Sequence, residues 1–176
     1  GSGGTARQER HAVHVMSVAR SKSLITCCLL LVSGAPGASG SERAVGVEGT
    51  YVGNGRAADV AHVRIIAADP WQGETSYMII VSEKDASTAD QPDFGAMFGE
   101  LGDALVVSIT ESGEIFSTQV CHQELEKSGF SSAGSLRVED FEIADGKLSA
   151  RFLTEGEQEF SGDRWQVDLE VTGELP

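Results

Sequence analysis

The chain has 176 residues, and its 27 Asp and Glu residues outnumber its 13 Lys and Arg residues, which gives a formal net charge of −14 at pH 7. A field of this sign repels phosphate backbones and anionic lipid head groups, which argues against binding to nucleic acids or membrane surfaces. The length allows one domain once the N-terminal segment is set aside.

The N-terminal segment predicts export. Residues 16–40 begin with a short basic stretch, continue with the apolar run 24–32, and end in small residues. This order is typical of a secretory signal peptide, and the apolar run is shorter than the roughly 20 residues that span a bilayer. We expect a periplasmic or extracellular protein with no membrane insertion after signal removal. Lipid attachment at Cys27 or Cys28 is not favoured, because Thr26 stands where a lipoprotein signal has a small residue.

Residues 1–15 precede the first Met and are interpreted as non-native or as an over-extended start. Removal of residues 1–40 takes away four basic residues and one acidic residue, and leaves 9 basic and 26 acidic ones. Cys121 is then the sole cysteine, so the mature chain contains no pair for an internal disulfide. A chain of this size buries enough surface to be stable through its core alone.

The remaining sequence predicts a single β domain over 48–172, with a tether at 41–47 and a tail at 173–176. Strict alternation of apolar and polar residues, typical of a strand with one buried face, is clearest at 164–171 and in the strand before it. Apolar residues follow one another at 78–81, which predicts a central strand covered on both faces. The predicted strands are 48–52, 60–67, 75–81, 104–110, 115–121, 136–143, 147–152 and 164–171.

Turn chemistry joins these strands. The stretches 53–55, 111–114 and 145–146 contain residues that accept a positive φ angle, and 69–73 is expected to be a loop. Leu136 and Val138 have even residue numbers and Phe141 and Ile143 odd ones, so in a regular strand the two pairs would point to opposite faces. A bulge at 139–140 would return both pairs to one face.

One short helix is expected near 93–101. Its apolar residues recur at three- and four-residue spacing and are expected to face the core; they are Phe94, Met97, Phe98 and Leu101. Asp90 or Asp93 is the expected N-cap. About eight mostly antiparallel strands and this helix predict an all-β sandwich or partly open barrel.

Several stretches carry a resemblance to a known group of proteins. They are Gly-Thr-Tyr-Val-x-Asn-Gly at 49–55, Ala-His-Val at 61–63, Gly-Phe-Ser-Ser-x-Gly at 129–134, Asp-Gly-Lys-Leu-Ser-Ala-Arg-Phe-x-Thr at 145–154 and Trp-x-Val-Asp at 165–168. Over roughly 47–172 the sequence resembles a family of exported bacterial all-β domains with no assigned activity. The resemblance implies export and a β fold. It also makes His62 and His122 the polar positions of interest, because other members often carry His there.

No stretch matches a catalytic or metal-binding motif. Residues 129–133 lack the second Gly of a hydrolase elbow. Cys121 adjoins His122, but consecutive strand residues point to opposite faces, so a nucleophile–base pair is not expected. A zinc site would need His62, His122 and Cys121 to converge, and the acidic stretches 155–159 and 85–93 lack the spacing of a calcium loop. We assign no catalytic residue, metal or cofactor, and take His62 and His122 as the candidate ligand-binding residues.

The sequence therefore favours a non-catalytic binding or accessory module of the cell envelope, with an unknown protein or small-molecule ligand and an unknown oligomeric state. Two alternatives stay open: a small hydrolase that uses carboxylates or the two histidines, and a domain that binds a divalent cation. An enzyme should show a concave pocket with titratable groups of shifted pKa. A binding module should show an exposed aromatic patch or an unpaired sheet edge.

Overall fold

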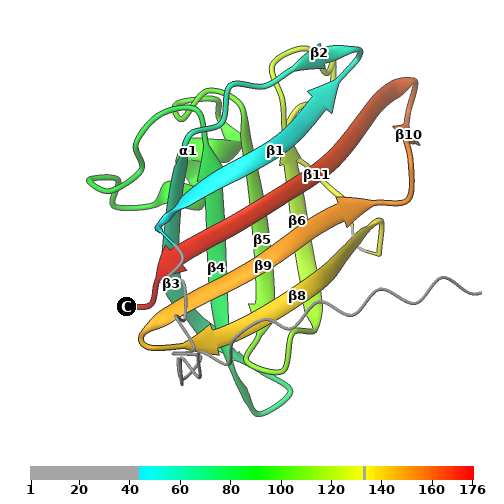
Figure 1. The fold of residues 1–176 in the computed structure, drawn as a ribbon. Helices are drawn as coiled ribbons and strands as arrows, with labels where there is room; N and C mark the ends of the chain where they lie inside the picture. The colour runs from blue at the N-terminus through cyan, green and yellow to red at the C-terminus, as the bar shows by residue number, and fades with distance from the viewer. Residues whose placement is uncertain (1–43, 133) are drawn as a thin grey trace, which may run out of the picture. The chain divides into compact units, whose positions relative to one another are not determined.

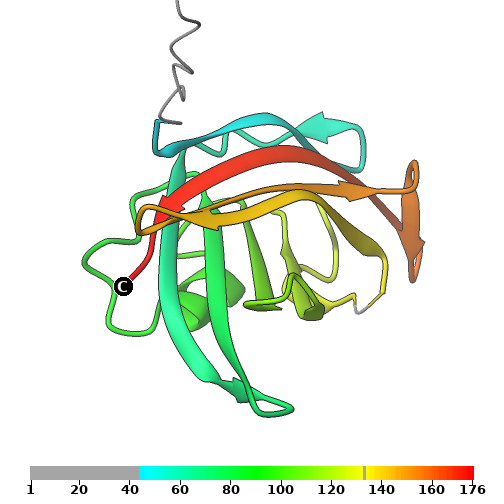
Figure 2. The same cartoon turned by 60° about the horizontal axis from the view of Figure 1, so that its bottom comes forward.

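The strands form two antiparallel sheets in the computed structural model, which describes residues 44–132 and 134–176 (Figure 1). The expected signal peptide, residues 1–15, Cys27 and Cys28 lie outside the described residues. Figure 2 shows the sheets as two layers that face each other. The fold is thus all-β, and of the two predicted architectures it is the sandwich.

The first sheet has the strand order β2-β1-β11-β9-β8, and β10 pairs with β11. The second sheet has the order β3-β4-β5-β6-β7. The eight described strands of seven residues or more correspond to the eight predicted ones. The bounds are β1 (Gly46–Gly53), β2 (Arg56–Ala57), β3 (His62–Trp71), β4 (Glu74–Ser82), α1 (Pro92–Met97), β5 (Ala104–Thr110), β6 (Ile115–Cys121), β7 (Phe130–Ser131), β8 (Leu136–Ala144), β9 (Lys147–Thr154), β10 (Gln158–Phe160) and β11 (Asp163–Glu174).

The main core lies between the sheets. The alternation at 164–171 is confirmed, because its four apolar side chains are buried against the second sheet. The first sheet contributes Trp165, Val167, Leu169, Val171, Tyr51, Leu148 and Phe152, and the second contributes Ile65, Ile79, Val81, Leu105, Val107 and Ile109. At about 25 cal/mol per Å² of buried apolar surface, this cluster is the main source of stability.

The second sheet also has a covered outer face. Ile80 and Val106 point away from the main core and pack in a second apolar cluster with Ala96 of α1 and Leu101. The prediction that the strand at 75–81 is covered on both faces is confirmed by this layer. The helix and its flanking loops therefore belong to the fold, and any side chain that α1 turns outward is held on a packed element.

The prediction for the helix was wrong in two details. Its N-cap is Gln91, and no side-chain hydrogen bond caps it. Of its apolar residues only Leu101, just beyond α1, is buried, whereas Phe94 and Phe98 are exposed. Successive helical residues are about 100° apart, so Ala96 lies opposite both Phe rings. Because Ile80 and Val106 already fill the sheet face, only a small side chain fits beneath the helix.

The predicted bulge in β8 is confirmed: the register with β9 shifts between Glu139 and Glu142, and Asp140 has a φ angle of 50°. The predicted loop at 69–73 was wrong. β3 continues to Trp71, and its pairing with β4 is irregular after Ala68. This irregularity accommodates Pro70, which has no N–H to donate to the neighbouring strand. The turn is confined to Gln72 and Gly73, which have positive φ angles.

The first and last long strands are neighbours. β1 pairs with β11 along its whole length, from Gly46 opposite Thr172 to Gly53 opposite Trp165. β1 begins two residues before the expected start of the domain, and β11 runs to Glu174, beyond the expected end at 172. No helix among the described residues has the length and apolar character needed to cross a membrane.

Candidate functional site

His122 is a core residue. Its side chain follows the end of β6 and has no exposed surface. The ring Nε2–H donates to the carbonyl oxygen of Arg56 at 3.1 Å, and Nδ1 accepts the backbone N–H of Glu124 at 3.2 Å. Tyr51 packs edge-on against the ring, with centroids 5.1 Å apart. Both ring nitrogens are thus used within the fold, and this pattern of one donor and one acceptor fits a neutral imidazole.

Space for the ring is made by Gly53 of β1, in the opposite sheet. A Cβ atom at Gly53 would lie 2.6 Å from Cγ and 2.7 Å from Nδ1 of His122. The residue before the turn at 54–55 is therefore glycine because the imidazole occupies the place of its side chain. The sequence contains Gly53, but nothing in it shows that the ring of His122 lies across from it.

Asp103 adjoins the histidine without a hydrogen bond to it. Its Oδ1 lies 3.7 Å from Nδ1 of His122 and accepts the backbone N–H of Gln123 at 2.7 Å. Glu83 in turn accepts the N–H of Asp103 at 3.2 Å. Burial raises the pKa of the neighbouring Cys121 thiol to about 11, which disfavours the thiolate needed for nucleophilic attack. The arrangement fixes the loops at this end of the sandwich.

His62 lies elsewhere. It is exposed at the start of β3, opposite Ser82, and the row of paired residues continues through Ala104 to Cys121. With adjacent strands about 4.8 Å apart, three steps place His62 roughly 14 Å from Cys121. The structure thus keeps His62 apart from the His122 region, and a ligand-binding role for the two histidines stays a prediction. Among the described residues no group of three or more His, Cys, Asp or Glu side chains is arranged to hold a metal ion.

The outer face of the first sheet carries a charged pair. Arg151 donates from Nε and Nη2 to the two carboxylate oxygens of Asp168, at 2.8 and 2.9 Å, and these bonds lower the pKa of Asp168. Two shallow hollows adjoin Arg151, and Glu170 lines both. The guanidinium is already paired and acids surround it, so this face is a poor anion site.

A buried carboxylate fastens the loop after β6. Asp163 accepts hydrogen bonds from the Asn54 side chain at 2.9 Å and from the backbone N–H groups of Glu126 and Lys127 at 3.0 and 3.1 Å. These bonds, that from Asn54 foremost, lower the pKa of Asp163. The contacts hold the turn at 54–55, the start of β11 and the loop at 122–129 together.

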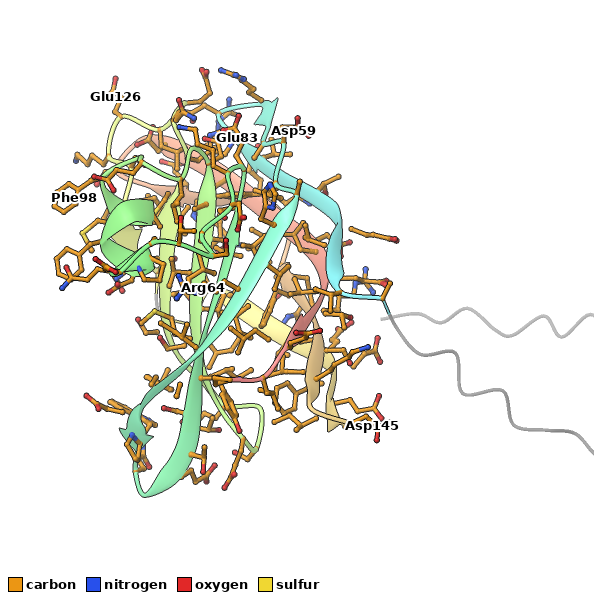
Figure 3. All side chains as sticks on the ribbon, turned by 90° about the vertical axis from the view of Figure 1, so that its left-hand side faces the viewer. Asp59, Arg64, Glu83, Phe98, Glu126 and Asp145 are labelled. Atoms are coloured by element: carbon orange, nitrogen blue, oxygen red, sulfur yellow. The ribbon has the colours of Figure 1, made fainter. Side chains whose placement is uncertain are left out.

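The most exposed large apolar side chain in the described part of the chain is Phe98. It directly follows α1 and is 71% exposed, and Phe94 on the helix is 49% exposed. Their rings stack with centroids 6.3 Å apart, and we call this pair the α1 aromatic surface. Figure 3 shows Phe98 projecting from the edge of the molecule.

Other exposed aromatic side chains are backed by the fold. Trp71 stacks on Phe116 with centroids 4.6 Å apart. Phe160 stacks on Phe130, which in turn contacts the buried Trp165. The two rings of the α1 aromatic surface have only each other as aromatic neighbours among the described residues.

The α1 aromatic surface is held on a fixed support. Ala96 packs on the second sheet, and a Cβ at Gly129 would lie 3.0 Å from Cγ of Met97, so the loop at 122–129 abuts the helix. The loop before α1 is fixed by Arg64, which donates to the carbonyl oxygens of Ala86 and, at 2.8 Å, Ala89. Periodicity alone assigned the two Phe residues to the core. The small Ala96 opposite them was the signal for the reverse orientation.

Comparison with protein-family models, with curated proteins and with solved structures found no match.

Proposed function

We propose that the domain is a non-catalytic binding module of an exported protein, and that it holds a protein partner on the α1 aromatic surface. The observation that carries this proposal is the outward orientation of Phe94, on α1, and Phe98, directly after it, although Ala96 of the same helix packs on the second sheet. Residues 16–40, with the pattern of a signal peptide, support export.

The energetic argument rests on burial. Full burial of a Phe side chain contributes about 1.5–3 kcal/mol, so two rings that are half exposed or more leave a substantial part of this free energy for a partner to gain. Aromatic side chains are frequent anchors of protein interfaces. The support beneath α1 is already ordered, so little conformational entropy is lost when a partner docks.

The buried polar groups support a structural role for the other candidate region. His122, Asp103 and Asp163 each make hydrogen bonds to backbone groups within the fold. The two hollows on the first sheet adjoin a paired Arg151, and their lining contains no Ser, Cys or His.

Selection of random displayed peptides against the protein tests the proposal. Peptides selected on the wild type should still bind Trp71→Ser, a matched loss of an exposed aromatic ring, and should lose binding to Phe98→Ser. Both variants should keep a cooperative thermal transition. A selection without binders, or binders indifferent to Phe98→Ser, would refute the proposed surface. Fractionation of cells that express the full chain tests export.

A further inference from the structure

The segment that presents the α1 aromatic surface is strongly acidic. Residues 83–103, which connect β4 to β5 and cover the outer face of the second sheet, contain six acidic residues and one basic residue. They are Glu83, Asp85, Asp90, Asp93, Glu100 and Asp103, against Lys84.

Three of these carboxylates are available to pair with the cations of a partner. Glu83 and Asp103 accept backbone N–H groups inside the fold, and Asp85 bonds to Ser87. Asp90, Asp93 and Glu100 form no ion pair with any described Lys or Arg. The one base of the segment, Lys84, donates to the backbone carbonyl oxygen of Glu100 at 3.2 Å and does not neutralise its carboxylate.

A fourth carboxylate comes from the neighbouring loop. Glu126 is exposed, and the contact of Gly129 with Met97 places its loop beside α1. Figure 3 shows Glu126 and Phe98 projecting on the same side of the molecule. Lys127 adjoins Glu126, and Arg64 contacts the loop before α1 through the carbonyl oxygens of Ala86 and Ala89. The segments around the two rings therefore carry four outward carboxylates and the bases Lys84, Lys127 and Arg64. We call Asp90, Asp93, Glu100 and Glu126 the acidic rim.

We propose that the partner presents a cationic amphipathic segment, in which Lys or Arg side chains flank apolar ones; this inference rests on the proposed function. Apolar side chains of the segment pack on Phe94 and Phe98, and its cations pair with the acidic rim or lie over a ring face. Two other occupants fit the charge poorly. A second copy brings the same acidic rim against this one, and an anionic membrane repels it.

Short synthetic peptides test this chemistry directly. Three labelled peptides of equal length, with alternating Lys and Leu, Glu and Leu, or Ser and Leu, are titrated with the full chain and followed by fluorescence anisotropy at low and high salt. The Lys–Leu peptide should bind most tightly and weaken as salt increases. Phe98→Ser should weaken it by about tenfold or more, because the ring loses its burial.

The acidic rim is tested by a pair of matched double variants. Asp93→Asn/Glu100→Gln should weaken the Lys–Leu peptide about two- to fivefold, the usual range for exposed ion pairs. Glu142→Gln/Asp145→Asn makes the same change in net charge on the β8–β9 hairpin, which lies away from Phe98 in Figure 3, and should leave binding unchanged. Equal weakening by both double variants would overturn the inference, because net charge alone would then explain the attraction.

The outcomes separate this inference from the proposed function. If the Glu–Leu or Ser–Leu peptide binds as tightly and Phe98→Ser abolishes it, the docking surface stands and the cationic preference is overturned. If the Lys–Leu peptide binds Phe98→Ser as tightly as the wild type, both are overturned. Sedimentation that shows dimers lost in Phe98→Ser would make a second copy the occupant and refute the inference.

Discussion

Gly53→Ala should destabilise the fold far more than one added methyl group usually does. The new Cβ would lie 2.6 to 2.8 Å from three ring atoms of His122, and the ring is fixed by Arg56, Glu124 and Tyr51. Overpacking of a filled site costs about 1–3 kcal/mol. A ring that moves away instead leaves buried polar groups unpaired, at about 1–3 kcal/mol. Either route predicts a loss of about 1–3 kcal/mol in the free energy of unfolding.

Urea unfolding followed by circular dichroism measures this loss, and Gly46→Ala is the matched control. Gly46 lies in the same strand, neither glycine has a left-handed φ angle, and a Cβ at Gly46 meets nothing within 4 Å. The control should stay within about 0.5 kcal/mol of the wild type. At roughly 4 °C per kcal/mol, Gly53→Ala should lower the melting temperature by roughly 4–12 °C.

Equal stability of the two alanine variants would refute the reasoning. A second background sharpens the test: in His122→Ala the ring is gone, so adding Gly53→Ala should cost less than about 1 kcal/mol. A full cost in that background would mean that the ring is not what excludes the methyl group.

Three further predictions concern single side chains. Because folding lowers the pKa of Asp163, its carboxylate stabilises the folded state fully above its unfolded pKa of about 3.9 and progressively less as the pH falls through the folded value. The stability difference between wild type and Asp163→Asn should therefore shrink in acid unfolding curves, and a constant difference would contradict this. Burial raises the pKa of the Cys121 thiol to about 11, so the thiol should resist iodoacetamide in the folded protein and react after denaturation. Mass spectrometry of the peptide that contains Cys121 measures the labelling, and prompt labelling of the folded protein would contradict the prediction. Arg151→Lys loses the two-pronged contact with Asp168, yet should cost less than about 1 kcal/mol in chemical denaturation because the pair is partly exposed; a larger loss would contradict an exposed pair.

The β part of the fold was predictable because alternation records which face of a strand is buried. The parity change in β8 even located a bulge, since a two-residue period leaves no other way to keep Val138 and Phe141 on one face. Pairing between distant strands was not predictable. Alternation in β1 and β11 shows two half-buried strands, but does not show that they are neighbours.

The candidate site was harder to predict because its features depend on contacts across the sheets. The ring of His122 occupies a space left by Gly53, and the backbone of the loop at 122–129 is fastened by Asp163. The two Phe rings beside α1 were misplaced because apolar spacing identifies a stripe on a helix and ignores how much room lies beneath it. The space between α1 and the second sheet determined which side of the helix faces the core, and the small Ala96 faces the sheet.

The position of β11 between β1 and β9 determines when the first sheet can form as the chain is synthesised. Among the described strands β1 comes first in chain order, and its central partner β11 comes last. Until residues 163–174 emerge from the ribosome, β1 and β9 lack the strand that joins them, so the first sheet cannot form before all of its strands have been synthesised. A nascent chain of this topology therefore keeps its first sheet open until β11 has been synthesised. Early termination before β11 would leave two unpaired strand edges, which are templates for aggregation.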